Sequence, residues 1–118
     1  ITIKHRNHLE TVSANPVSFA NLEVSYDFTS AETQAYGNAV DNELMKELEN
    51  GIWGIWAGDV SQDGILTIDD SGPVNAGITG DSKGYIATDV NGDAIVTIDD
   101  SGIVNANITG GISSSQPE

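Results

Sequence analysis

Two twelve-residue segments that begin 30 positions apart carry the same pattern of oxygen-bearing side chains. The first, residues 59–70, reads DVSQDGILTIDD, and the second, residues 89–100, reads DVNGDAIVTIDD. In both segments, oxygen-bearing side chains stand at the first, third, fifth, ninth and twelfth places. A calcium ion takes about six to eight oxygen ligands, and a twelve-residue loop with this spacing wraps one ion. The duplication therefore predicts two bound calcium ions, each in an acidic loop that leads into a short helix.

The expected ligands follow from the places within each loop. Side chains at the first, third, fifth and ninth places, the main-chain carbonyl at the seventh and the carboxylate at the twelfth would surround the ion. In the first loop these residues are Asp59, Ser61, Asp63, Ile65, Thr67 and Asp70. In the second loop they are Asp89, Asn91, Asp93, Ile95, Thr97 and Asp100. The ninth-place threonines would act directly or through a water molecule.

The two loops differ at the sixth place, where a sharp turn favours positive φ. Gly64 suits that turn, whereas Ala94 carries a Cβ that costs about 1 kcal/mol in the left-handed region. We therefore expect the second site to be the weaker or more distorted one. Leu66 and Val96 hold the eighth places, where we expect a short antiparallel bridge between the loops.

Composition narrows the setting and the partners. The formal net charge is −14, with 18 acidic residues against 4 Lys and Arg, which argues against nucleic acid or an anionic membrane as a partner. The chain has no Cys, so metal rather than disulfide bonds would stabilise small repeats. These features favour a secreted or cell-surface protein in calcium-rich surroundings. No apolar run reaches the length of a membrane span, so membrane insertion is not expected.

The residues before the loops predict mainly strands. Apolar alternation over residues 1–30 suggests two or three strands, the last over residues 17–28. Residues 41–50 suggest a short helix that Asp41 would cap and that Gly51 would end, and residues 52–56 suggest a strand leading into the first loop. The chain begins in the middle of a strand, so we expect a fragment of a longer polypeptide whose first strand needs neighbours.

These elements predict an α+β fold. A partial β-sandwich-like unit at residues 1–57, the end of a larger upstream domain, would precede a tandem EF-hand-like pair of loops and helices at residues 58–112. Residues 113–118 would form a tail. The segments after the loops contain Gly, Asn and Thr, so the helices should be short.

The segments 58–70 and 85–100 resemble a type I dockerin, and the chain is similar to the dockerin-like C-terminal tails of secreted or surface proteins of Bacteroidota. The resemblance also extends to residues 4–9, 56–59 and 114–117. It implies two calcium ions, a helix after each loop and a protein partner of the cohesin type. The chain departs from the dockerin pattern at the tenth and eleventh loop places, which hold Ile68-Asp69 and Ile98-Asp99, and no Lys or Arg follows either loop in the helical segment.

The resemblance and the loops together indicate a non-catalytic calcium-binding module that mediates protein–protein docking or surface assembly of a larger protein. One alternative is a structural calcium clasp that stabilises the C-terminus of an adhesin or a glycoside hydrolase. Another is a carbohydrate-binding module that stacks sugars on Trp53 and Trp56. The partner would be the upstream part of the parent protein or a cohesin-like surface protein. No nucleophile-and-base pair or cofactor fingerprint is present, so we do not expect an enzyme. His5 and His8 would point to opposite faces of a strand, which argues against a zinc site.

Overall fold

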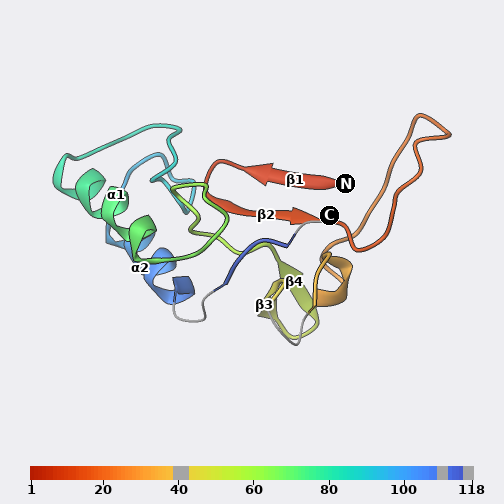
Figure 1. The fold of residues 1–118 in the computed structure, drawn as a ribbon. Coiled ribbons are helices and arrows are strands. Elements are labelled where there is room, and N and C mark those ends of the chain that lie inside the picture. The colour runs from red at the N-terminus through yellow and green to blue at the C-terminus, as the bar shows by residue number, and fades with distance from the viewer. Residues whose placement is uncertain (39–42, 109–111, 116–118) are drawn as a thin grey trace.

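The computed structural model describes residues 1–38, 43–108 and 112–115, and it combines two small antiparallel sheets with two α-helices (Figure 1). The chain is therefore of mixed α+β character. The elements in order are β1 Thr2–His5, β2 His8–Val12, the 3-10 helix η1 Glu32–Gln34, β3 Lys46–Glu49, β4 Ile52–Gly54, α1 Ile68–Thr79 and α2 Ile98–Asn107. The sandwich-like unit expected over residues 1–57 stays a prediction, because the described residues there form two separate hairpins.

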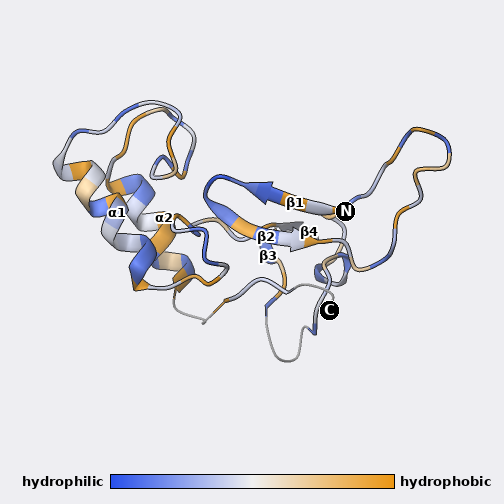
Figure 2. Cartoon of the chain, turned by 45° about the horizontal axis from the view of Figure 1, so that its top comes forward, coloured by the Kyte–Doolittle hydropathy of each residue, from blue (hydrophilic) through white to orange (hydrophobic). Residues whose placement is uncertain are grey.

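The first hairpin joins β1 to β2 in the register Thr2↔Val12 and His5↔His8. The Ile1 carbonyl also accepts a hydrogen bond of 2.7 Å from the Ser13 N–H, so the opening strand finds a partner within the chain. The turn of the β1–β2 hairpin lies beside the loops that precede the helices. Figures 1 and 2 show this hydrophilic end of the hairpin pointing toward those loops. The hairpin therefore carries residues from the start of the chain to the two acidic loops.

Two of the expected elements before the loops are wrong. Residues 17–28 form no strand; they belong to an arm that extends away from the rest of the chain (Figure 1), with Phe19 67% and Leu22 98% exposed. The helix expected over residues 41–50 is replaced at its end by β3, while Asp41 lies outside the described residues. The reason is the Asn-Gly step at residues 50–51, a strong hairpin signal with φ +80° at the glycine. Its turn pairs β3 with β4 and overrides the helical spacing.

Each helix begins inside its loop, at the tenth place, with Ile68 or Ile98 as its first residue, rather than after the twelfth place as the sequence predicts. Thr67 and Thr97 are the N-caps, and each forms a capping box with the aspartate three residues further on, Asp70 or Asp100. The twelfth-place carboxylates are therefore fixed by helix geometry as well as by the loops. No helix in the described residues is both long and apolar enough to cross a membrane.

The two helices pack against each other through matching contacts. The Ser71 hydroxyl donates to Asn105 Oδ1 at 2.8 Å, and the Ser101 hydroxyl donates to Asn75 Oδ1 at 3.3 Å. The serine of each repeat thus contacts the asparagine of the other repeat. The two helices are therefore related to each other by an approximate two-fold symmetry. A valine cluster fills the space between the helices and the loops: Val60, Val74, Val90, Val96 and Val104.

A second apolar cluster ties the first loop to the ends of the chain. Leu9 of β2, Trp56, Leu66 of the first loop and Ile112 are each buried in it. The Leu66 N–H also donates to the Ile112 carbonyl at 2.8 Å. The eighth places of the two loops therefore pack differently, because Leu66 joins this cluster whereas Val96 joins the valine cluster.

Candidate metal centre

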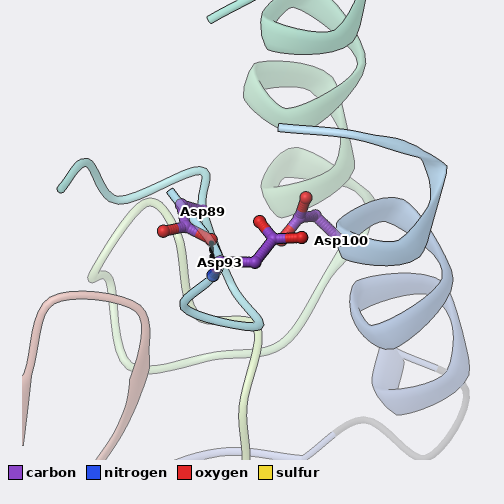
Figure 3. A group of neighbouring side chains, drawn as sticks. All are labelled: Asp89, Asp93 and Asp100. Atoms are coloured by element: carbon purple, nitrogen blue, oxygen red, sulfur yellow. Dashed lines mark hydrogen bonds between the residues drawn. The ribbon is translucent and has the colours of Figure 1, made fainter. Parts of the chain in front are cut away.

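The second loop brings three carboxylates together. One oxygen each from Asp89, Asp93 and Asp100 lies within 4.8 Å of the others, and Figure 3 shows Asp89 and Asp93 on the loop facing Asp100 at the start of α2. Asp89 and Asp100 are 1% and 0% exposed, whereas Asp93 is exposed. Clustered carboxylate oxygens are the ligands that hard divalent cations prefer. This cluster could therefore hold a metal ion.

Main-chain N–H groups of the same loop orient the carboxylates. Asp89 Oδ1 accepts from the N–H groups of Gly92 and Asp93, at 2.9 and 3.1 Å, and its Oδ2 accepts from Ala94 at 3.0 Å. Asp100 Oδ1 accepts from Val90 and Asn91, at 2.8 and 3.1 Å, and its Oδ2 accepts from Thr97 at 2.8 Å. The first and twelfth places are thus held in position by the backbone that lies between them.

The first loop repeats this pattern, except that one of its carboxylates, unlike its counterpart in the second loop, has an oxygen without a hydrogen-bond partner. Asp70 Oδ1 accepts from the Ser61 N–H at 3.0 Å, and its Oδ2 accepts from the Thr67 N–H at 2.9 Å. Asp59 Oδ2 accepts from Gly64 at 3.2 Å, but Asp59 Oδ1 is buried without any hydrogen-bond partner. A buried, unpartnered carboxylate oxygen is costly unless a cation binds it, so this orphaned atom fits a metal site.

The surroundings of Asp59 disfavour an uncompensated negative charge on its carboxylate. Burial raises the pKa of the Asp59 carboxyl, and the negative charges of Asp70 and Asp63 raise it further. Hydrogen bonds from the loop backbone oppose this rise. Within the described residues, the trio of the second loop is the only group of three or more carboxylate or imidazole ligands that approaches this closely. Asp59, Asp63 and Asp70 are therefore less tightly gathered than their counterparts.

The backbone at the sixth place takes the conformation that the sequence predicts. Gly64 has φ +85° and Ala94 has φ +70°, so both loops make the same left-handed turn. The fourth places share it, with φ +58° at Gln62 and +83° at Gly92. Despite the strain at Ala94, the second loop is the one whose carboxylates are gathered, which differs from the expectation that it would be the more distorted. The expected order of affinities stays a prediction.

The expected bridge between the two loops is wrong. Ile65 pairs with Ser113 and Ile95 pairs with Lys83 in isolated antiparallel bridges, so each loop finds its own neighbouring segment. The ninth-place hydroxyls of Thr67 and Thr97 accept from the N–H groups of Asp69 and Asp99 at 3.3 Å. The remaining predicted third-place ligands, Ser61 and Asn91, are exposed on the loops.

Positive charge near the loops is scarce. Four carboxylates are nearly or fully buried, namely Asp59, Asp70, Asp89 and Asp100. Of the four Lys and Arg side chains, all of which the structure describes, only Arg6 forms an ion pair with one of them, at 3.8 Å between Nη2 and Asp89 Oδ2. Lys4 pairs with Glu10, Lys83 pairs with Asp81, and Lys46 donates to Asn107 Oδ1. Because buried charges need compensation, the loops fit divalent cations.

Two residues of the β1–β2 turn complete the second loop, and spacing within the repeats gave no signal for either. Arg6 Nη2 donates to the Asp89 carbonyl at 3.2 Å, its Nε donates to the Ile86 carbonyl at 3.1 Å, and its guanidinium lies 3.8 Å from the centre of the Tyr85 ring. Asn7 is 0% exposed and donates from Nδ2 to the carbonyls of Asp89 and Ala87, at 2.8 and 3.0 Å. Only an unusual polar pair at a hairpin turn could have suggested them.

The prediction that the two histidines face opposite ways is wrong. His5 and His8 are cross-strand partners beside the turn, and their ring centres are 4.3 Å apart in an edge-to-face arrangement. Both line a cavity of about 250 Å³ next to the first loop, together with Asp59 and Asp63. Burial lowers the pKa of His8 to about 4, with the nearby charges of His5 and Arg6 adding to the effect.

The tryptophans predicted as a sugar platform occupy different environments. Trp56 is 8% exposed in the cluster that includes Leu66, and its indole N–H donates to the Glu43 carbonyl at 3.0 Å. Trp53 is half-buried, and it lines a cavity of about 500 Å³ with Trp56 and several glutamates. The ring of Trp56 is therefore committed largely to packing.

No family model, no curated protein and no solved structure matches this chain. The functional argument therefore rests on the geometry and chemistry of the acidic loops.

Proposed function

We propose that this chain is a non-catalytic calcium-binding module whose two loops each hold one Ca²⁺ ion. The observation that carries the proposal is the set of carboxylates in the two loops, above all the buried, unpartnered Asp59 Oδ1 and the closely spaced trio of the second loop. Their all-oxygen donor sets suit a hard cation, and flexible loops of this length suit calcium better than magnesium, which demands tighter octahedral geometry.

The residues proposed to hold the ions are the twelve that the sequence predicts. In the first loop they are Asp59, Ser61, Asp63, Ile65 through its carbonyl, Thr67 and Asp70. In the second they are Asp89, Asn91, Asp93, Ile95 through its carbonyl, Thr97 and Asp100. Each ion would neutralise carboxylates that otherwise repel one another in a partly dry environment.

The proposal is tested by thermal melts of the chain in calcium and in excess chelator. Ligand linkage adds about 2.7 kcal/mol for each site held at a hundred times its dissociation constant. We therefore expect a clear rise in the melting temperature with calcium and a smaller one with magnesium. Equal melting temperatures in calcium and chelator would overturn the proposal.

We further propose that the module docks a secreted or cell-surface protein onto another polypeptide, as its resemblance to dockerins suggests. The supporting observation is the exposure of Ile68 and Ile98, at 73% and 78%, at equivalent positions in the first turn of each helix. Contiguous apolar patches mark contact surfaces and single exposed apolar side chains are common, so the supporting feature is the recurrence of an exposed isoleucine at the same place in both repeats.

A structural calcium clasp is the second candidate, and contacts across the chain favour it. The Ser114 N–H donates to the Gly64 carbonyl at 2.8 Å, and the Asn7 amide reaches Asp89, so the loops hold segments from both ends of the chain. The double variant Ile68→Glu/Ile98→Glu separates the candidates in a calcium-dependent pull-down from the parent organism's surface proteins. If the module docks, the unmodified protein retains a partner chain in calcium and loses it in chelator. The double variant then retains no partner chain, although its own calcium-dependent melting is unchanged. A clasp predicts the same melting behaviour with no chain retained.

A further inference from the structure

One buried residue of the β1–β2 turn, Asn7, contacts the second acidic loop with its side chain and the residue before the first acidic loop with its main chain. Its main-chain carbonyl accepts a hydrogen bond of 2.7 Å from the N–H of Gly58, the residue directly before Asp59. Its side-chain Nδ2 donates to the carbonyl of Asp89 at 2.8 Å. Asn7 therefore joins the start of the first loop to the first predicted ligand of the second, across 82 residues of sequence.

The orientation of the Asn7 amide is fixed by its neighbours. Nδ2 faces two carbonyl oxygens, those of Ala87 and Asp89, which can only accept. Oδ1 must then face His5 and His8, whose Nδ1 atoms lie at 3.0 and 2.8 Å. Both rings therefore donate from Nδ1–H, and no alternative placement of the amide satisfies all four contacts. The amide therefore has hydrogen-bond partners at both its oxygen and its nitrogen.

Arg6 strengthens the attachment of the turn to the second loop. Its hydrogen bonds to the carbonyls of Ile86 and Asp89 and its stacking on Tyr85 fix the segment that leads into this loop. When the hairpin is docked, the backbone of Asp89 is held by both turn residues. When the hairpin is displaced, the carbonyls of Ile86, Ala87 and Asp89 lose the donors that the turn supplies, which is unfavourable.

We infer that the hairpin turn couples the two metal loops, so that calcium at one loop strengthens binding at the other, with Asn7 as the positioning residue. This rests on the proposed function. An ion that orders the first loop fixes Gly58 and thereby holds the hairpin where Asn7 meets Asp89. The second loop then loses less conformational freedom when its own ion binds, which gives positive cooperativity. By thermodynamic reciprocity the second ion strengthens binding of the first equally.

The helix pair offers a competing route between the loops, and the test must separate the two. The contact of Ser71 with Asn105 joins the same repeats without involving the hairpin. Calorimetric titration of the whole chain with calcium measures the affinity of the second loop, first with the first loop intact and then with Asp63→Asn. The ratio of the two affinities is the coupling factor, for which we expect at least about fivefold.

Asn7→Ala should reduce this ratio to near one, whereas Ser71→Ala should leave it unchanged. An unchanged ratio in Asn7→Ala, or a ratio lost in Ser71→Ala alone, would overturn the inference. If neither loop takes up calcium, the proposed function fails; if the unmodified chain binds two ions with a ratio of one, only the coupling fails.

A second measurement does not depend on the folding of Asn7→Ala. In the Asp63→Asn variant, calcium bound at the second loop should slow hydrogen exchange of the Gly58 amide, although the adjacent first loop is disabled. Arg6→Gln, which weakens the attachment but leaves Asn7 in place, should diminish this protection. Exchange at Gly58 that is indifferent to calcium would refute the transmission through the turn.

Discussion

Replacing Asp59 by Asn should change the stability of this chain in opposite directions with and without calcium. Asp59 is 3% exposed, and its Oδ1 has no hydrogen-bond partner, while Asp70 and Asp63 place negative charge nearby. Asparagine keeps an oxygen that accepts from the Gly64 N–H, and it replaces the orphaned oxygen with an uncharged donor near two carboxylates. In the metal-free protein the substitution therefore removes an unfavourable buried charge. In the calcium form it removes the first ligand of the loop.

The magnitude follows from these two effects. A buried polar group without a partner costs about 1–3 kcal/mol, so the variant should be more stable than the parent chain by about 1–2 kcal/mol in chelator. At a calcium concentration a hundred times the dissociation constant, the parent gains about 2.7 kcal/mol from the first site, which the variant loses. The variant should then be the less stable by about 1 kcal/mol. For a domain of this size, 1 kcal/mol shifts the melting temperature by about 4 °C.

Circular dichroism melts of both chains, in chelator and in saturating calcium, measure the crossover. Asp69→Asn is the matched control, because it removes the same charge from an exposed residue one place away from Asp70. Asp69→Asn should change the stability only slightly, and in the same direction in chelator and in calcium. A variant at Asp59 that is less stable than the parent chain even in chelator would show that its buried charge is compensated without metal, and the reasoning would fail.

Further predictions address the loop register, the backbone and pH. Asp70→Ala should abolish calcium binding at the first loop in calorimetric titration while Asp69→Ala retains it; the reverse result would place the ligand register one residue off. Ala94→Gly should stabilise the metal-free chain by about 0.5 kcal/mol in denaturant titrations, because it relieves the left-handed strain at φ +70° at a partial cost in unfolded-chain entropy, and a loss of stability would contradict this. Because the pKa of His8 is lowered to about 4 in the folded state, its contribution to stability is complete above the unfolded value of about 6.5 and is lost as the pH falls toward 4. We expect this loss of stability to be about 1–2 kcal/mol after allowing for partial solvent exposure. Denaturation curves measured in chelator at several pH values should show the loss in the parent chain and not in His8→Gln. The same pH dependence of stability in both chains would refute the assignment of the loss to His8.

The sequence by itself determined the features that depend on nearby residues. The duplicated spacing marked both acidic segments and the positive φ at Gly64 and Ala94, and it indicated a helix toward the end of each segment, although the helices begin at the tenth place rather than after the twelfth. These features need no knowledge of the rest of the fold.

Only the tertiary structure decided what surrounds the loops. Arg6 and Asn7 reach Asp89 from more than 80 residues away, and the pairing of Ile65 with Ser113 replaced the expected bridge between the loops. No periodicity encodes such contacts, because they depend on which apolar surfaces pack and on which buried carbonyls then need donors. The hairpin at residues 46–54 illustrates the same competition at shorter range: a turn signal and cross-strand pairing prevailed over a helical pattern. Local sequence specifies the loops, whereas the contacts that hold them in place depend on tertiary packing.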